Sequence, residues 1–312
     1  MKHEHQFARR IAAMAVAAVL ALAAAPTAAA DKIAVVATFS VIGDLVTQIA
    51  EDRVQLATIV GPDGDSELYQ PTVADAKTIA DAKIVFMNGL NDEFEPWLEP
   101  LLKRAKFTGA KVVVSRGAKT LTASEENAPT GKPMPAAIDQ HAWLDPKNGI
   151  VYVKNIAEAL AKYDPANAAP YRARAAAYGD ELKALDAWAK AEMAAVPAAK
   201  RRIISSHDSL EYLAKAYNIT LISVNGWTNN AEPSAAELAR LTQQIRQEHV
   251  RALFLDSITD PRAMQRIAKE TGVSLGEALY GDALSKPGGE ADTYVKMIRH
   301  DIAALKAGML KN

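Results

Sequence analysis

The sequence predicts an α/β fold of two three-layer lobes, each a parallel β-sheet flanked by helices, joined by one long connecting helix. Two observations predict the lobes: short β-branched segments alternate with helical segments over residues 32–115, and the alternation returns over 202–271. Such alternation is typical of parallel sheets covered by helices. A third observation predicts the connection, because residues 165–195 are rich in Ala, Glu, Lys and Leu and contain a single glycine.

The first half contains the signals of four strands and four helices. Runs rich in Val, Ile and Ala predict strands at 32–38, 54–60, 84–87 and 111–115. Apolar residues at helical spacing predict helices at 40–51, 72–81, 94–106 and 151–163. Between the last two helices, residues 120–140 contain three prolines and a glycine, which predicts a surface loop.

The second half repeats this plan after the long helix. Strands are predicted at 202–206, 220–224 and 252–255, and helices at 210–217, 233–248, 261–271 and 293–310. A helix of about 25–30 residues would be ~40 Å long, at 1.5 Å per residue. We therefore divide the chain into an N-terminal lobe (31–163), a linking helix (164–197) and a C-terminal lobe (198–312).

The first 30 residues have the pattern of an export signal. A basic start with Lys2, Arg9 and Arg10 precedes an apolar run at 11–25, and small residues follow Pro26. The run is shorter than the ~20 residues that a helix needs to span a bilayer. We expect a signal peptide over residues 1–30, cleavage before Asp31 and release into a bacterial periplasm. A retained membrane anchor is the alternative.

Charge and cysteine content exclude several classes of function. Without the charged residues of the first 30 positions, 33 basic and 36 acidic residues remain, so the chain has no basic excess for binding nucleic acid. The chain contains no cysteine. Disulfides, catalytic thiols, thiolate metal sites and a lipid-modified N-terminal cysteine are therefore excluded.

Two of the four histidines beyond residue 31 lie where a ligand site is expected. His207 follows the predicted strand at 202–206, and ligands of open α/β sheets gather at the carboxyl ends of strands. His141 lies between the proline-rich loop and a predicted helix. His249 and His300 lie in charged helical stretches and are expected to be solvated. A single histidine is more often structural than a ligand, so the pattern alone leaves both roles open.

Motifs along residues 32–310 resemble the periplasmic substrate-binding proteins of zinc, manganese and iron ABC importers (the cluster A-I family). The resemblance rests on segments from both halves of the chain, which follow one another in the same order as in the family. They are ATFSVIGD (37–44), GPDGDSELYQPT (61–72), DAK (75–77), VFMNG (85–89), QHAWLDP (140–146), SHDSLEYL (206–213), EPSA (232–235) and LYGDALS (279–285). It implies a protein that captures a metal ion between its lobes and delivers it to the importer's permease, rather than an enzyme. We expect a monomer.

The resemblance also implies a four-residue metal site, with two ligands from each lobe. Members of the family place the second, third and fourth ligands where this chain has His141, His207 and Asp282. The first ligand is usually a histidine, but here that position is Glu67. A carboxylate binds the same ions, and its reach permits bidentate contact. Either Glu67 is the first ligand, or it points to solvent and the other three residues hold the metal together with water.

The expected ligand set favours manganese or ferrous iron, with zinc close behind. Two carboxylates and two histidines form an oxygen-rich set, although zinc also binds such sets readily. Zinc-specific relatives often carry a His-rich loop, and residues 120–140 contain no histidine. The alternative function is a mononuclear metallohydrolase or lyase that uses the same residues. An enzyme would need an open coordination position, whereas all four candidates are assigned as ligands.

Overall fold

The N-terminal lobe is built on a four-stranded parallel sheet. Its strands are β1 (Ile33–Phe39), β2 (Val54–Val60), β3 (Ile84–Met87) and β4 (Ala110–Val113), in the order β2-β1-β3-β4. The computed structural model describes residues 32–91, 94–122, 138–207, 209–223, 235–248 and 250–312. The expected signal peptide and most of the expected loop at 120–140 lie outside these residues.

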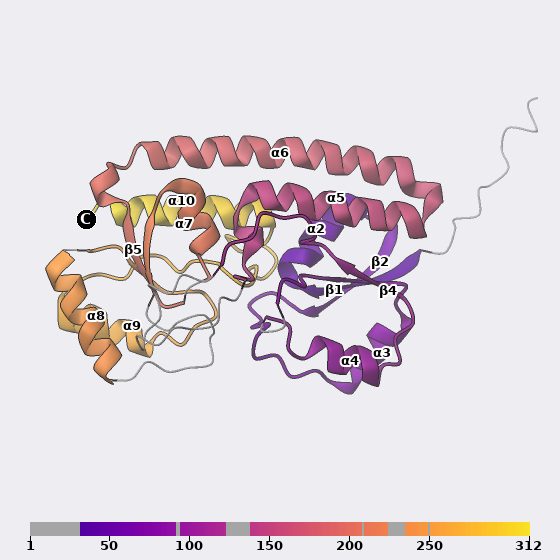
Figure 1. Cartoon of the computed structure of the whole chain (residues 1–312), viewed down its shortest axis with the longest axis horizontal. Coiled ribbons are helices and arrows are strands. Elements are labelled where there is room, and N and C mark those ends of the chain that lie inside the picture. Colours follow the sequence, from indigo (N-terminus) through magenta and orange to yellow (C-terminus); the bar gives the residue numbers. More distant parts are fainter. Residues whose placement is uncertain (1–31, 92–93, 123–137, 208, 224–234, 249) are drawn as a thin grey trace, which may run out of the picture. The chain divides into compact units, whose positions relative to one another are not determined.

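Helices cover both faces of this sheet. Helices α2 (Ser40–Ala50) and α5 (Pro146–Tyr163) lie on one face, and α3 (Val73–Asp81) and α4 (Leu98–Arg104) on the other (Figure 1). Local capping sets where two of them begin. The Thr72 side chain and Asp75 form a capping box for α3, and Asp145 accepts the Lys147 N–H at the start of α5.

The C-terminal lobe is built on a smaller parallel sheet. Strands β5 (Arg202–Ser205), β6 (Thr220–Ser223) and β7 (Leu253–Phe254) run in the order β6-β5-β7. The helices of this lobe are α7 (Glu211–Tyr217), α8 (Ala235–Glu248), α9 (Arg262–Thr271) and α10 (Tyr294–Met309). The expected α/β class with two helix-flanked parallel sheets is confirmed.

The long connecting helix is also confirmed. Helix α6 (Ala168–Ala194) spans 27 residues and packs against α5 of the first lobe and α10 of the second (Figure 1). Its buried residues include Tyr171, Leu182 and Met193, spaced along its length. The helix is therefore packed along its length onto both lobes. Among the described residues, no helix is both long and apolar enough to cross a membrane.

The two lobes share a large hydrophobic core and several hydrogen bonds, and a second, smaller core lies within the C-terminal lobe. The Trp143 Nε1–H donates to the Gly281 carbonyl at 2.8 Å, and the Tyr294 hydroxyl donates to the Trp143 carbonyl at 2.6 Å. The backbone N–H of Tyr294 donates to Asp44 Oδ2 at 2.8 Å, and that of Leu284 donates to Ser40 Oγ at 2.9 Å. These bonds connect α2 and the segment before α5 to the last segments of the second lobe, and all but the part-buried bond to Asp44 are buried.

Some element boundaries differ from the sequence-based expectation. Helix α5 begins at Pro146 rather than at 151, because Asp145 caps it and proline is well suited to a first helical turn. The helix expected at 94–106 begins only at Leu98, after a turn in which Phe94 and Trp97 are buried. Strand β7 has only two residues instead of four.

Candidate metal centre

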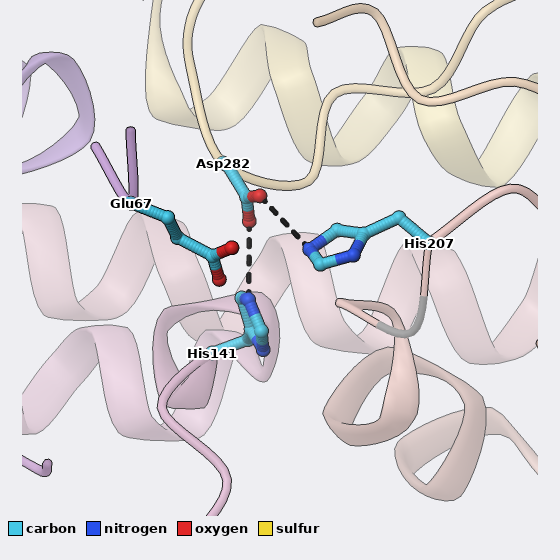
Figure 2. A group of neighbouring side chains, drawn as sticks. All are labelled: Glu67, His141, His207 and Asp282. Atoms are coloured by element: carbon cyan, nitrogen blue, oxygen red, sulfur yellow. Dashed lines mark ion pairs between the residues drawn. The ribbon is translucent and has the colours of Figure 1, made fainter. Parts of the chain in front are cut away.

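The structure brings together the four side chains that the sequence singled out. Glu67, His141, His207 and Asp282 each offer one ligand atom, and these atoms all lie within 4.8 Å of one another (Figure 2). All four residues are buried, with exposures of 4% for Glu67 and 0–1% for the others. A tetrahedral ion with bonds of about 2.0 Å holds its ligands ~3.3 Å apart, so only a modest contraction would close the site around an ion.

Local structure fixes the direction of Glu67. The loop that follows β2 is turned by Asp65, whose Oδ1 accepts the N–H of Glu67 at 2.8 Å and of Leu68 at 3.0 Å. The Trp97 Nε1–H also donates to the carbonyl of Ser66 at 2.8 Å. The Glu67 carboxylate lies with the other three candidates (Figure 2) and does not point to solvent, so the solvated alternative for this residue is not what the structure has.

His141 is oriented by the residue two positions before it. Asp139 Oδ1 accepts the His141 backbone N–H at 2.9 Å and lies 2.8 Å from His141 Nδ1. A carboxylate only accepts hydrogen bonds, so the proton is on Nδ1 and Nε2 faces the centre. The rings of Trp143 and Phe94 pack edge-on against the imidazole, with centroids 5.3 and 6.1 Å from that of the imidazole.

Asp282 lies between the two imidazoles. Its Oδ1 is 3.3 Å from His141 Nε2, and its Oδ2 is 3.1 Å from His207 Nε2 (Figure 2). His207 lies just beyond the carboxyl end of β5, as expected. With His141 protonated on Nδ1, its Nε2 carries a lone pair that faces a carboxylate oxygen. Two such groups repel each other unless a cation, either a proton or a metal ion, lies between them.

The pKa values of His141 and Asp282 are shifted because these buried groups lie close to each other. Burial disfavours the charged imidazole, but the Asp282 and Asp139 carboxylates outweigh it and raise the pKa of His141 well above its usual range. Burial likewise disfavours the charged carboxylate, but His207 and His141 hold the pKa of Asp282 well below its usual range. The centre therefore favours an ionised aspartate and a positive charge beside it.

The loop that carries Asp282 is held by buried side chains that the sequence did not reveal. Asp256 Oδ2 accepts the Gly281 N–H at 3.1 Å, and Asp301 Oδ1 accepts the Tyr280 N–H at 3.0 Å. Trp143 binds the Gly281 carbonyl from the other lobe. No spacing rule predicts these partners, because they come from distant elements. Asp139 is different, since it lies within the His141 segment and could have been proposed as its partner.

The other two histidines lie away from the centre or outside the described residues. His300 was expected to be solvated, but its side chain is only 10% exposed and contacts Glu290 Oε2 at 3.2 Å and the Ala278 carbonyl at 2.8 Å. That expectation is wrong, because α10 turns this histidine toward the loop before Tyr280 rather than to solvent. His249 lies outside the described residues.

Comparison with known proteins matches this architecture over most of the chain. Residues 35–308 match the family model described as zinc-uptake complex component A, periplasmic (ZnuA). This chain belongs to the ZnuA family. The ZnuA family and its curated relatives comprise substrate-binding components of metal importers, which supports a binding protein and gives no support to the hydrolase alternative.

Curated relatives are named either for manganese or for an unspecified metal. The chain is 32% identical to the manganese ABC transporter substrate-binding lipoprotein PsaA of Streptococcus pneumoniae, with 90% of each chain covered. It is 34% identical to the metal ABC transporter substrate-binding lipoprotein SloC of Streptococcus mutans, covering 89% of this chain and 90% of the relative.

Solved structures share the fold. The periplasmic zinc binding protein TroA of Treponema pallidum superposes with a TM-score of 0.81 at 27% identity, covering 89% of this chain and 99% of that one. A Mn-bound periplasmic metal binding protein of Candidatus Liberibacter asiaticus gives a TM-score of 0.77 at 29% identity, covering 89% and 100%. Zinc and manganese both appear among these names, so likeness alone does not select the metal.

Proposed function

We propose that this ZnuA-family chain binds one divalent transition-metal ion through Glu67, His141, His207 and Asp282. The observation that carries the proposal is the convergence of these four buried side chains from both lobes. Two carboxylates and two neutral imidazoles match the charge of a divalent ion, so the ion and its ligands compensate one another in a buried site.

The captured ion would be delivered to the membrane permease of an ABC importer, which works with its ATPase. We place the protein in the periplasm, after removal of residues 1–30, and expect it to be a monomer. Several curated relatives are named lipoproteins, whereas this sequence has no cysteine to carry a lipid. The mature chain would then consist of the two lobes at 31–163 and 198–312, with 164–197 between them.

Manganese or ferrous iron is the proposed cargo, with zinc as the main competitor. The donor set supports this cargo, because two carboxylate groups make the ligands more oxygen-rich, and so better suited to manganese, than three histidines and one carboxylate would be. Names of relatives point both ways, with manganese in PsaA and zinc in TroA. The order of the two affinities is therefore a quantity to be measured.

Metal titration of purified protein tests the site. After removal of bound metal with a chelator, Mn²⁺, Fe²⁺ and Zn²⁺ are titrated in turn against wild type, His207→Ala, Asp282→Ala and Glu67→Ala. Each ligand variant should bind at least ~100-fold more weakly, since even partners outside the ligand set contribute 10–100-fold to metal affinity.

His300→Ala is the matched control, because this histidine is partly buried in the same lobe as His207 but contacts Glu290 rather than the centre. Its affinity should stay within about twofold of wild type. If wild-type protein binds none of the three ions, the proposed function is wrong. If Glu67→Ala alone leaves affinity unchanged, Glu67 is not a ligand and the site has three protein ligands.

A further inference from the structure

A buried carboxamide contacts the one candidate ligand that departs from the family pattern. Gln140 is 3% exposed, and its Nε2–H donates to Glu67 Oε1 at 2.6 Å. We propose that Gln140 is a positioning residue that makes Glu67 a one-oxygen ligand and thereby raises the site's affinity for Zn²⁺ relative to its affinity for Mn²⁺. The inference rests on the proposed function, because it concerns how the same site distinguishes two ions.

The direction of the hydrogen bond follows from chemistry. An ionised carboxylate has no donor, so only the NH₂ end of the Gln140 carboxamide can face it, and the reversed amide would place two oxygens against each other. A hydrogen bond to a charged acceptor is stronger than one between neutral groups. Glu67 Oε1 is therefore held by a specific and directional contact.

The backbone of Gln140 is held by a buried side chain. The Asn88 Nδ2–H donates to the backbone carbonyl of Gln140 at 2.8 Å, and the Tyr152 hydroxyl donates to Asn88 Oδ1 at 2.6 Å. Both Asn88 and Tyr152 are fully buried. The residues on either side of Gln140 are also fixed, since Asp139 binds the backbone and ring of His141. The backbone at Gln140 is therefore fixed before any ion binds, and the printed contact of its carboxamide is the hydrogen bond to Glu67, since the buried Oε1 has no hydrogen-bond partner among the described residues.

The hydrogen bond from Gln140 to Glu67 limits how many oxygens the site offers to an ion. Glu67 is held at its backbone N–H by Asp65 and at Oε1 by Gln140, so rotation of its carboxylate toward two-oxygen binding would break a short hydrogen bond. With one oxygen from Glu67, one nitrogen from each imidazole and one or two oxygens from Asp282, the ion meets four or five donors. Zn²⁺ is satisfied by four ligands, whereas Mn²⁺ favours six oxygen-rich positions.

The test compares two affinities in one variant. Gln140→Met keeps the length of the side chain but removes the donor, so Glu67 is free to turn. We expect Zn²⁺ affinity to fall about tenfold, as for loss of a partner that orients a ligand. Mn²⁺ affinity should change much less, because a second Glu67 oxygen offsets the loss. The Zn²⁺/Mn²⁺ affinity ratio should therefore fall about tenfold, and Mn K-edge absorption should report a higher coordination number.

Gln48→Leu is the matched control, because Gln48 Nε2 donates to the Asp44 carboxylate at 2.9 Å on α2, away from the candidate ligands. It should leave the ratio unchanged. In a Glu67→Ala background, Gln140→Met should have no further effect on the ratio, since the two residues act as a pair. Gln140→Asn, which shortens the reach of the amide by one methylene, serves as the second variant if Gln140→Met does not fold.

A ratio that stays at the wild-type value in both Gln140 variants, or that rises, overturns the inference. So does an unchanged Mn coordination number. Failure of the proposed function looks different, because wild-type protein would then bind neither ion.

Discussion

At the scale of single residues, the centre is organised by three carboxylates that each make a different contact. Asp282 faces both imidazoles, Asp139 orients His141, and Asp256 holds the backbone beside Asp282. Burial and repulsion from Asp282 raise the pKa of Asp256 to about 7. A second buried negative charge beside Asp282 is thus disfavoured, and a divalent cation at the centre would make it more tolerable.

Glu95 gives a prediction about pH that does not depend on metal. This carboxyl accepts the Asn88 N–H, and burial raises its pKa from 4.5 to about 7. The folded protein therefore binds this proton more tightly than the unfolded chain. The stability from this group is fully present below pH 4.5 and is lost as pH rises through 7.

In Glu95→Gln, which stays neutral, that loss should be absent. The difference in unfolding free energy between the variant and wild type should therefore rise by about 3 kcal/mol between pH 5 and pH 8. Urea unfolding of metal-free protein at several pH values measures it. Glu181→Gln, on the exposed face of α6, is the control. If the free-energy difference between Glu95→Gln and wild type changes with pH as little as that of the control, the prediction is wrong.

At the scale of elements, α5 and α6 form a packed helix pair whose two glycines should respond in opposite ways. A Cβ at Gly179 on α6 would meet only Ile150 Cγ2, at 3.7 Å. Gly179→Ala should therefore stabilise the protein by about 0.5–1 kcal/mol, because alanine loses less conformational entropy in a helix. Metal affinity should not change.

Gly149 on α5 provides the contrast. A Cβ there would lie 2.7 Å from the Tyr294 hydroxyl, which donates to the Trp143 carbonyl. Gly149→Ala should destabilise the protein by roughly 1–3 kcal/mol and also weaken metal binding, because Trp143 supports the Asp282 loop. Denaturant unfolding and metal titration of both variants check the pair. Equal effects in the two helices would show that this packing argument is wrong.

At the scale of the whole molecule, the described part of the chain predicts limited motion on metal binding. The lobes share a core and buried hydrogen bonds, and α6 packs against helices of both. We expect metal-free and metal-bound forms to have nearly the same small-angle scattering profile. Hydrogen exchange should slow mainly around His207 and Asp282, since both lie in the second lobe. A large-angle opening in solution would contradict this.

Much of the fold was predictable because its signals are local. Alternating strand and helix patterns located the elements, and the single glycine over 165–195, with no proline after Pro170, predicted α6. The start of α5 was missed because the cap at Asp145 decides it. The short β7 was overestimated because tertiary pairing, and not apolar composition alone, ends a strand.

The sequence by itself determined the α/β class, the two-lobe plan and, through family motifs, the four candidate ligands. Only the tertiary structure decided that Glu67 faces the other three, that Gln140 donates to Glu67 and that Asp256 binds the backbone beside Asp282. The reason is physical. Helix and strand patterns depend on neighbours a few residues apart, whereas these contacts form between segments that meet only when both sheets and the long helix have packed together.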